Sequence, residues 1–106
     1  DLAAREALMA ALDRLAFDRP ELTTVIVSHH LEELPGSTTH ALLLAGGRSL
    51  AEGPIHDVLT SDNLSTCFGL PVVCRHDGER WFARAKASWA RTAGASNLAM
   101  AGGGHG

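Results

Sequence analysis

The residues best suited to chemistry lie in the stretch TTVIVSHHLEELP, residues 23–35. An apolar, β-branched run ends there in a polar group made of Ser28, His29, His30, Glu32 and Glu33. A neutral imidazole presents one hydrogen-bond donor and one acceptor, so a histidine can hold an anionic oxygen or orient a water molecule. In open α/β sheets, ligands bind beyond the carboxyl ends of the strands. If Thr23–Val27 is a strand, His29 follows it at the end where ligands bind.

Other interpretations of the same stretch remain open at this point. A histidine after a strand is often a capping or surface residue, and motif matches carry a high false-positive risk. His29/Glu32 and His30/Glu33 have the i, i+3 spacing of two ligands on one helical face, but no H-E-x-x-H or paired C-x-x-C accompanies them. Pro35 also keeps the helix short, so we expect no metal ligands here. Ser28 is a poor nucleophile candidate because no G-x-S-x-G elbow surrounds it.

Composition and charge exclude several classes of protein. The 106 residues carry a formal net charge of −3 and no cluster of Lys and Arg, which argues against binding to nucleic acid. No apolar run approaches the length that spans a bilayer, so the sequence has the character of a soluble chain. Cys67 and Cys74 lie among apolar residues and are expected to be reduced packing residues.

Helical and strand patterns alternate in the first half of the chain. Residues 2–16 have helical periodicity with Leu8, Leu12 and Leu15 on one face, and Asp1 can cap the first turn. The β-branched run Thr23–Val27 lacks polar alternation, which is typical of a strand covered on both faces.

Two hairpins and two short helices are expected in the second half. A buried strand over 40–45 reverses at Gly46-Gly47, and a second hairpin turns around Asp77-Gly78. Helices are expected over 54–59 and from 61 to about 68, the second one capped by its own first polar residues. From residue 86 onward Ala, Gly and Ser dominate, so we expect an ordered part over 1–85 and a disordered tail over 86–106. The element order is that of an incomplete α/β layer structure.

The segments "DLAAREALMAALDRLA", "TTVIVSHHLEELP" and "HALLLAGGRSLAEGPIHDVLTSDNLSTCFGLPV" stand in one collinear order. Together they resemble the C-terminal portion of the ATP-binding subunit of ABC transporters, from the D-loop to the end of the nucleotide-binding domain. The resemblance implies an α/β fold that is part of a P-loop NTPase of the ABC type. Only its C-terminal portion would lie in residues 1–85, with a flexible Ala/Gly-rich tail after it. The variant "SHHLEELP" resembles importer subunits for iron chelates or oxyanions.

The resemblance assigns roles to two residues. His29 matches the switch histidine of the H-loop, which in this family hydrogen-bonds the ATP γ-phosphate and helps to hold the attacking water. Asp1 matches the aspartate that closes the D-loop, at the interface where two nucleotide-binding domains enclose ATP. His30 matches no catalytic position. ATP and Mg²⁺ are the implied cofactors. The implied partners are a second nucleotide-binding domain and a membrane permease, at the cytoplasmic face of the cell membrane.

The family motifs that cradle the triphosphate and bind Mg²⁺ are not in these 106 residues. There is no G-x-x-x-x-G-K-[ST] loop, no LSGGQ-like signature and no Walker B strand with its acidic residues, all of which precede the D-loop in the family. We therefore expect the chain alone not to hydrolyse ATP. The alternative function is that of a non-catalytic α/β interaction or regulatory module from a truncated gene of the same family.

Overall fold

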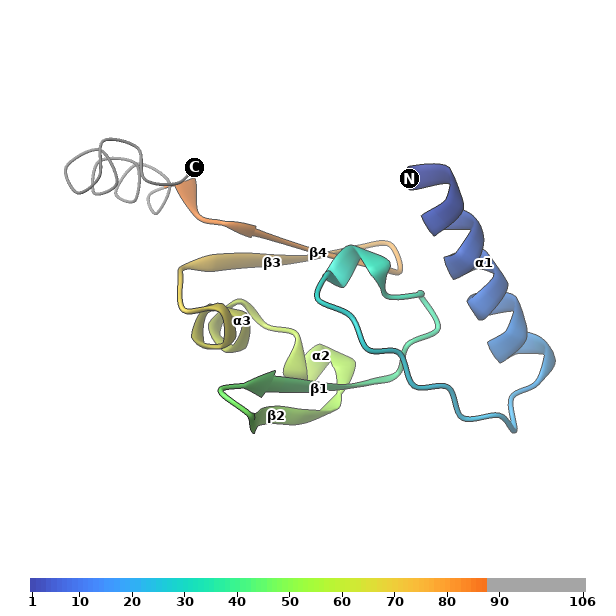
Figure 1. Cartoon of the computed structure of the whole chain (residues 1–106), viewed down its shortest axis with the longest axis horizontal. Coiled ribbons are helices and arrows are strands. Elements are labelled where there is room, and N and C mark those ends of the chain that lie inside the picture. Colours follow the sequence, from blue (N-terminus) through green and yellow to red (C-terminus); the bar gives the residue numbers. More distant parts are fainter. Residues whose placement is uncertain (88–106) are drawn as a thin grey trace.

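The computed structural model describes residues 1–87, and those residues form a mixed α/β fold (Figure 1). In chain order the elements are α1 (Leu2–Asp18), η1 (Leu31–Glu33), β1 (His40–Ala45), β2 (Arg48–Pro54), α2 (Ile55–Val58), α3 (Ser61–Phe68), β3 (Val72–Asp77) and β4 (Arg80–Ala85). The tail expected over 86–106 lies outside the described residues from residue 88 onward. No helix within residues 1–87 combines the length and the apolar character that crossing a membrane requires.

Helix α1 stands to one side of the other elements (Figure 1). As expected, Asp1 caps it: one carboxylate oxygen accepts a hydrogen bond of 2.8 Å from the backbone N–H of Ala4. Of the three leucines on its predicted apolar face, Leu8 and Leu15 are exposed and Leu12 is half-buried, whereas Met9 is the buried residue. Two of its polar side chains bond to the rest of the described chain: Glu6 accepts from Arg80, and Asp13 accepts from Ser37.

Two β-hairpins follow, and the sequence predicted both. Strands β1 and β2 pair antiparallel around Gly46-Gly47, whose φ angles of 59° and 74° are the two positive values that a type I′ turn requires. Strands β3 and β4 pair around the two-residue turn Gly78-Glu79. Strand β1 is less buried than expected, since Leu42 and Leu44 are exposed while alternate residues face the core. The hairpins form two separate two-stranded sheets.

The predicted strand at Thr23–Val27 is not formed. The segment belongs to no helix or strand, and Val25 and Val27 are 83% and 91% exposed. A β-branched run without polar alternation becomes a buried strand only when strands pair along both of its edges. No strand within residues 1–87 is hydrogen-bonded to this segment, and its side chains are exposed.

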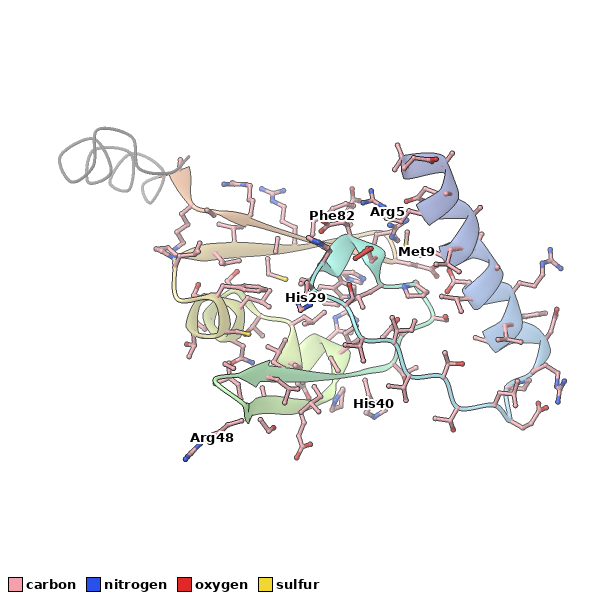
Figure 2. The ribbon with its side chains drawn as sticks, in the orientation of Figure 1. Arg5, Met9, His29, His40, Arg48 and Phe82 are labelled. Atoms are coloured by element: carbon pink, nitrogen blue, oxygen red, sulfur yellow. The ribbon has the colours of Figure 1, made fainter. Side chains whose placement is uncertain are left out.

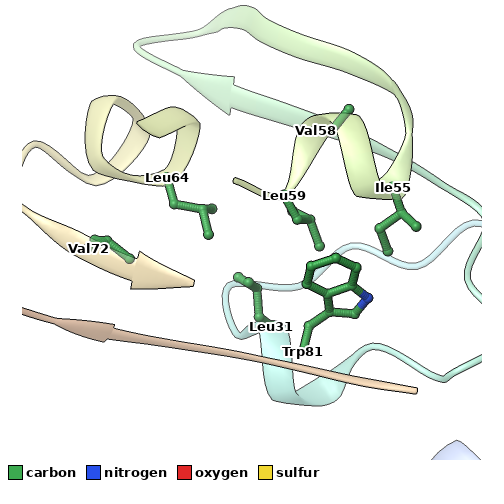
Figure 3. Close-up of a cluster of buried hydrophobic side chains, with 7 residues drawn as sticks. All are labelled: Leu31, Ile55, Val58, Leu59, Leu64, Val72 and Trp81. Carbon is green, nitrogen blue, oxygen red and sulfur yellow. The ribbon is translucent and has the colours of Figure 1, made fainter. Parts of the chain in front are cut away.

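The hydrophobic core joins the two hairpins to the short helices (Figure 3). Its buried residues are Leu31, Ile55, Val58, Leu59, Leu64, Val72 and Trp81. Helix α3 is capped by Thr60, one residue before Ser61, where the predicted cap begins. The Thr60 hydroxyl accepts a hydrogen bond of 3.1 Å from the backbone N–H of Asn63. Both cysteines are free thiols, as expected, and burial raises the pKa of Cys74.

Candidate functional site

Ser28 holds the backbone that follows His29. Its hydroxyl oxygen accepts a hydrogen bond of 3.0 Å from the backbone N–H of His30 and donates one of 2.9 Å to the carboxylate of Glu33. Turn η1 then begins at Leu31, whose side chain is buried in the core. The residue next to His29 is therefore held by a hydroxyl and the turn after it by a core leucine.

His29 itself is exposed on this fixed loop (Figure 2). No hydrogen bond joins its ring to another residue of the described chain, so both ring nitrogens are available to a ligand. The ring lines a shallow hollow of about 310 Å³. Its wall is mostly apolar and includes Phe68 of α3, Leu70 of the following loop, and Val72, Ala83 and Ala85 of the second hairpin, together with His30, Leu31, Glu32 and Arg84. His29 is thus a free donor or acceptor at the rim of a hollow that α3 and β4 complete.

Asp1 lies at a second hollow, of about 420 Å³. It is lined by Asp1, Leu2, Arg5, His30, Glu32 and Glu33. His30 and Glu32 border both hollows and form the wall between them. The two site residues expected from the sequence, Asp1 and His29, therefore open onto different sides of the same turn.

Arg80 joins three segments around the loop. One guanidinium nitrogen donates to a carboxylate oxygen of Glu6 in α1 at 2.8 Å, and another donates to the backbone oxygen of Glu32 in η1 at 2.6 Å. The hydrogen bond between Arg80 and the Glu6 carboxylate is the main reason that the pKa of Glu6 lies below its ordinary value. The β3–β4 hairpin, the turn that follows His29 and the helix that begins after Asp1 are thereby linked through one side chain.

The metal interpretation of the same histidines has little support. Glu33 is hydrogen-bonded to Ser28, and the nearest charge pair in the loop is His30 Nδ1 with Glu32 Oε1 at 3.7 Å. Within residues 1–87 no group of three or more His, Cys, Asp or Glu side chains is placed to hold a metal ion.

The sequence predicts His29 as a site residue and does not indicate the two residues that hold its loop, Ser28 and Arg80. Ser28 was considered only as a nucleophile, although a serine that precedes a short turn is a common local cap and signals that role. Arg80 gave no such signal, because its partners Glu6 and Glu32 are 74 and 48 residues away in the sequence.

The chain is similar to a curated protein and to a solved structure. It is 34% identical over 84 residues to a protein assigned as an ABC transporter ATP-binding protein in Streptococcus mutans serotype c, a match that covers 77% of this chain and 32% of that protein. The solved structure of a metal-chelate-type ABC transporter in an inward-facing conformation superimposes on 79% of this chain and 34% of its own, with a TM-score of 0.62 and 27% identity. No family model matches the sequence.

The mixed α/β fold of the described residues matches part of the structure of that ABC transporter. In sequence and in fold the chain is related to the ATP-binding subunits of ABC transporters. It spans about a third of the length of these relatives.

Proposed function

We propose that this chain is part of an ATP-binding subunit that powers transport through a membrane permease, and that His29 is its γ-phosphate-sensing residue. The observation that carries the proposal is that the His29 ring is available to a ligand. Its ring is exposed and without a hydrogen-bond partner among the described residues, on a loop that Ser28 and Leu31 hold in place. The collinear similarity to an ABC transporter ATP-binding protein supports the same role.

The chemistry of phosphoryl transfer suits such a histidine. Catalysis of this reaction rests on positioning and on donors aimed at oxygens that gain charge in the transition state. A ring N–H of His29 can supply one such donor to a γ-phosphate oxygen. The loop needs no rearrangement of its backbone to present it, because the hydrogen bonds of Ser28 are already made.

The described residues fit one contact to ATP and no more. They contain no G-x-x-x-x-G-K-[ST] loop to cradle the triphosphate, and no carboxylates grouped to bind Mg²⁺. The phosphate cradle and the Mg²⁺ ligands must then come from other residues of the complete subunit. We accordingly infer that the 106 residues alone do not hydrolyse ATP.

Asp1 and the partners complete the proposal. Asp1 caps α1 with one carboxylate oxygen, and no hydrogen bond to a residue within 1–87 occupies the other oxygen, which can face a second nucleotide-binding domain. The expected partners are therefore that second domain and a permease, with the subunit bound at the cytoplasmic face of the membrane. Residues 1–85 would form the last portion of the ATPase domain.

A chimera provides the experiment. Residues 1–87 replace the matching stretch of the Streptococcus mutans relative, and ATP hydrolysis and ATP binding are measured separately. We expect His29→Ala to lower kcat by about 10²–10³, the usual effect of removing one transition-state donor, with ATP affinity little changed.

His30→Ala is the matched control, because the neighbouring imidazole is also exposed and lies on the same loop. We expect it to change kcat only slightly. Equal losses of kcat in the two variants would contradict the role given to His29. If the chimera with the native loop binds ATP but does not hydrolyse it, the chain is instead a non-catalytic module.

A further inference from the structure

Three aromatic rings from separate elements meet at the edge of the core, next to its residue Trp81. His56 comes from α2, His76 from β3 and Trp81 from β4. The ring centroids of His56 and His76 are 4.8 Å apart, with the ring planes at 78°. Those of His76 and Trp81 are 4.2 Å apart and stacked at 19°, and those of His56 and Trp81 are 5.1 Å apart. Nothing in the proposed ATPase role uses this cluster.

The two imidazoles are free to bind. Both histidines are exposed, and no hydrogen bond or ion pair joins either ring to another residue of the described chain. Unpaired neutral imidazoles are the commonest protein ligands for transition-metal ions.

Their spacing is compatible with two ligands on one ion. Zinc–nitrogen bonds of about 2.0–2.1 Å and a tetrahedral angle of about 109° place the ring centroids of two bound imidazoles about 5 Å apart. The observed centroid separation of 4.8 Å permits this arrangement, and it is also the spacing of an edge-to-face aromatic pair.

The cluster is also held in place before any ion binds. His76 and Trp81 are directly opposite each other across the β3–β4 ladder, and Trp81 is only 6% exposed. Trp81 packs beneath α2 beside Ile55 and Leu59, and Ile55 and Val58, which flank His56 in the short helix, are buried (Figure 3). The backbones on both sides of the histidine pair are thus anchored in the core.

We propose that His56 and His76 together bind one divalent transition-metal ion, Zn²⁺ or Cu²⁺, with water completing the coordination. The ion would join α2 to the β3–β4 hairpin. Because it binds the folded arrangement of two elements 20 residues apart in sequence, it would stabilise that hairpin against local opening.

The test uses the full chain carrying Trp89→Phe, so that Trp81 is its one tryptophan. Zn²⁺ uptake is measured by calorimetry, and Cu²⁺ binding by quenching of Trp81 fluorescence. We expect one ion per chain, and we expect His56→Gln and His76→Gln each to weaken binding by at least about tenfold. His40→Gln, which alters an exposed histidine on β1, is expected to leave binding unchanged.

A cysteine variant separates lost ligation from lost folding. His56→Cys replaces one Zn²⁺ ligand by another and is expected to retain Zn²⁺ uptake, whereas His56→Gln is not. Uptake that persists in the His56→Gln/His76→Gln double variant would overturn the proposal, because the ion would then bind elsewhere. So would the absence of both uptake and Trp81 quenching in the parent chain.

Discussion

Removal of the guanidinium of Arg80 is expected to loosen the turn that follows His29. Arg80 donates to the backbone oxygen of Glu32 at 2.6 Å, within turn η1. Arg80→Met keeps much of the apolar stem of the side chain but removes this charged donor, so the carbonyl of Glu32 loses its partner.

The size of the effect follows from the exposure of Arg80. Hydrogen bonds to charged groups contribute about 1.5–3 kcal/mol to stability. A quarter of the Arg80 side chain is exposed to water, which competes for the same donor, so we take the lower end of that range. A loss of about 1.5 kcal/mol makes local opening of the turn about tenfold more frequent.

Amide hydrogen exchange measures that opening directly. The turn is closed by the hydrogen bonds from the backbone N–H of Glu33 to the oxygen of His30 and from that of Leu34 to the oxygen of Leu31. Both amides should exchange about tenfold faster in Arg80→Met. Arg84→Met is the matched control, because Arg84 lies on the same strand and bonds only to the neighbouring carbonyl of Ala85. Equal exchange rates in the two variants would refute the positioning role of Arg80.

Two further predictions concern the core and the attachment of α1. Leu64 is fully buried, so Leu64→Ala should lower the free energy of unfolding, measured by urea titration, by about 3–5 kcal/mol. Leu44→Ala is the control: this side chain is 61% exposed, and its removal should change the free energy of unfolding by less than about 0.5 kcal/mol. The pKa of Glu6 is lowered by its hydrogen bond to Arg80, so its stabilising contribution is present above the ordinary value of 4.5 and is lost as the pH falls through the lowered folded value. The protection factors of the α1 amides, which correct for the intrinsic pH dependence of exchange, should fall below pH 4.5, and Glu6→Gln should remove that part of the pH dependence. An unchanged pH profile of the protection factors in Glu6→Gln would contradict the assignment.

The parts of the fold that local chemistry decides could be predicted from the sequence. The pair Gly46-Gly47 permits the positive φ angles of its turn, and Asp77-Gly78 similarly marks the second hairpin. The error at Thr23–Val27 has a different origin. Its β-branched residues indicate that the segment suits burial, but burial also requires strands on both sides, and no local pattern reports whether they are present.

In the candidate site, too, residue types can be predicted from the local sequence, whereas contacts between distant elements cannot. His29 stays a prediction: its residue type suits ligand binding, but the strand whose carboxyl end was expected to place it is not formed within residues 1–87. The contacts of Arg80 and the approach of His56 to His76 could not be found, since they depend on how distant elements pack. The orientation of α1 was missed for the same reason: periodicity gives a helix one apolar face but does not say that polar contacts will fix it instead.

The turn between β3 and β4 has a consequence for engineering the chain. Surface turns usually accept inserted residues. The Gly78-Glu79 turn, however, is held on both sides. Arg80 bonds to Glu6 and Glu32, and Glu79 packs so closely on Gly36 that a side-chain carbon there would come within 2.7 Å of it. One added residue in the turn would displace Arg80 from its partners and Glu79 from Gly36. The Gly46-Gly47 turn has open space around it. A fluorescent label or an affinity tag therefore belongs in the first hairpin, where its linker leaves the loop of His29 untouched.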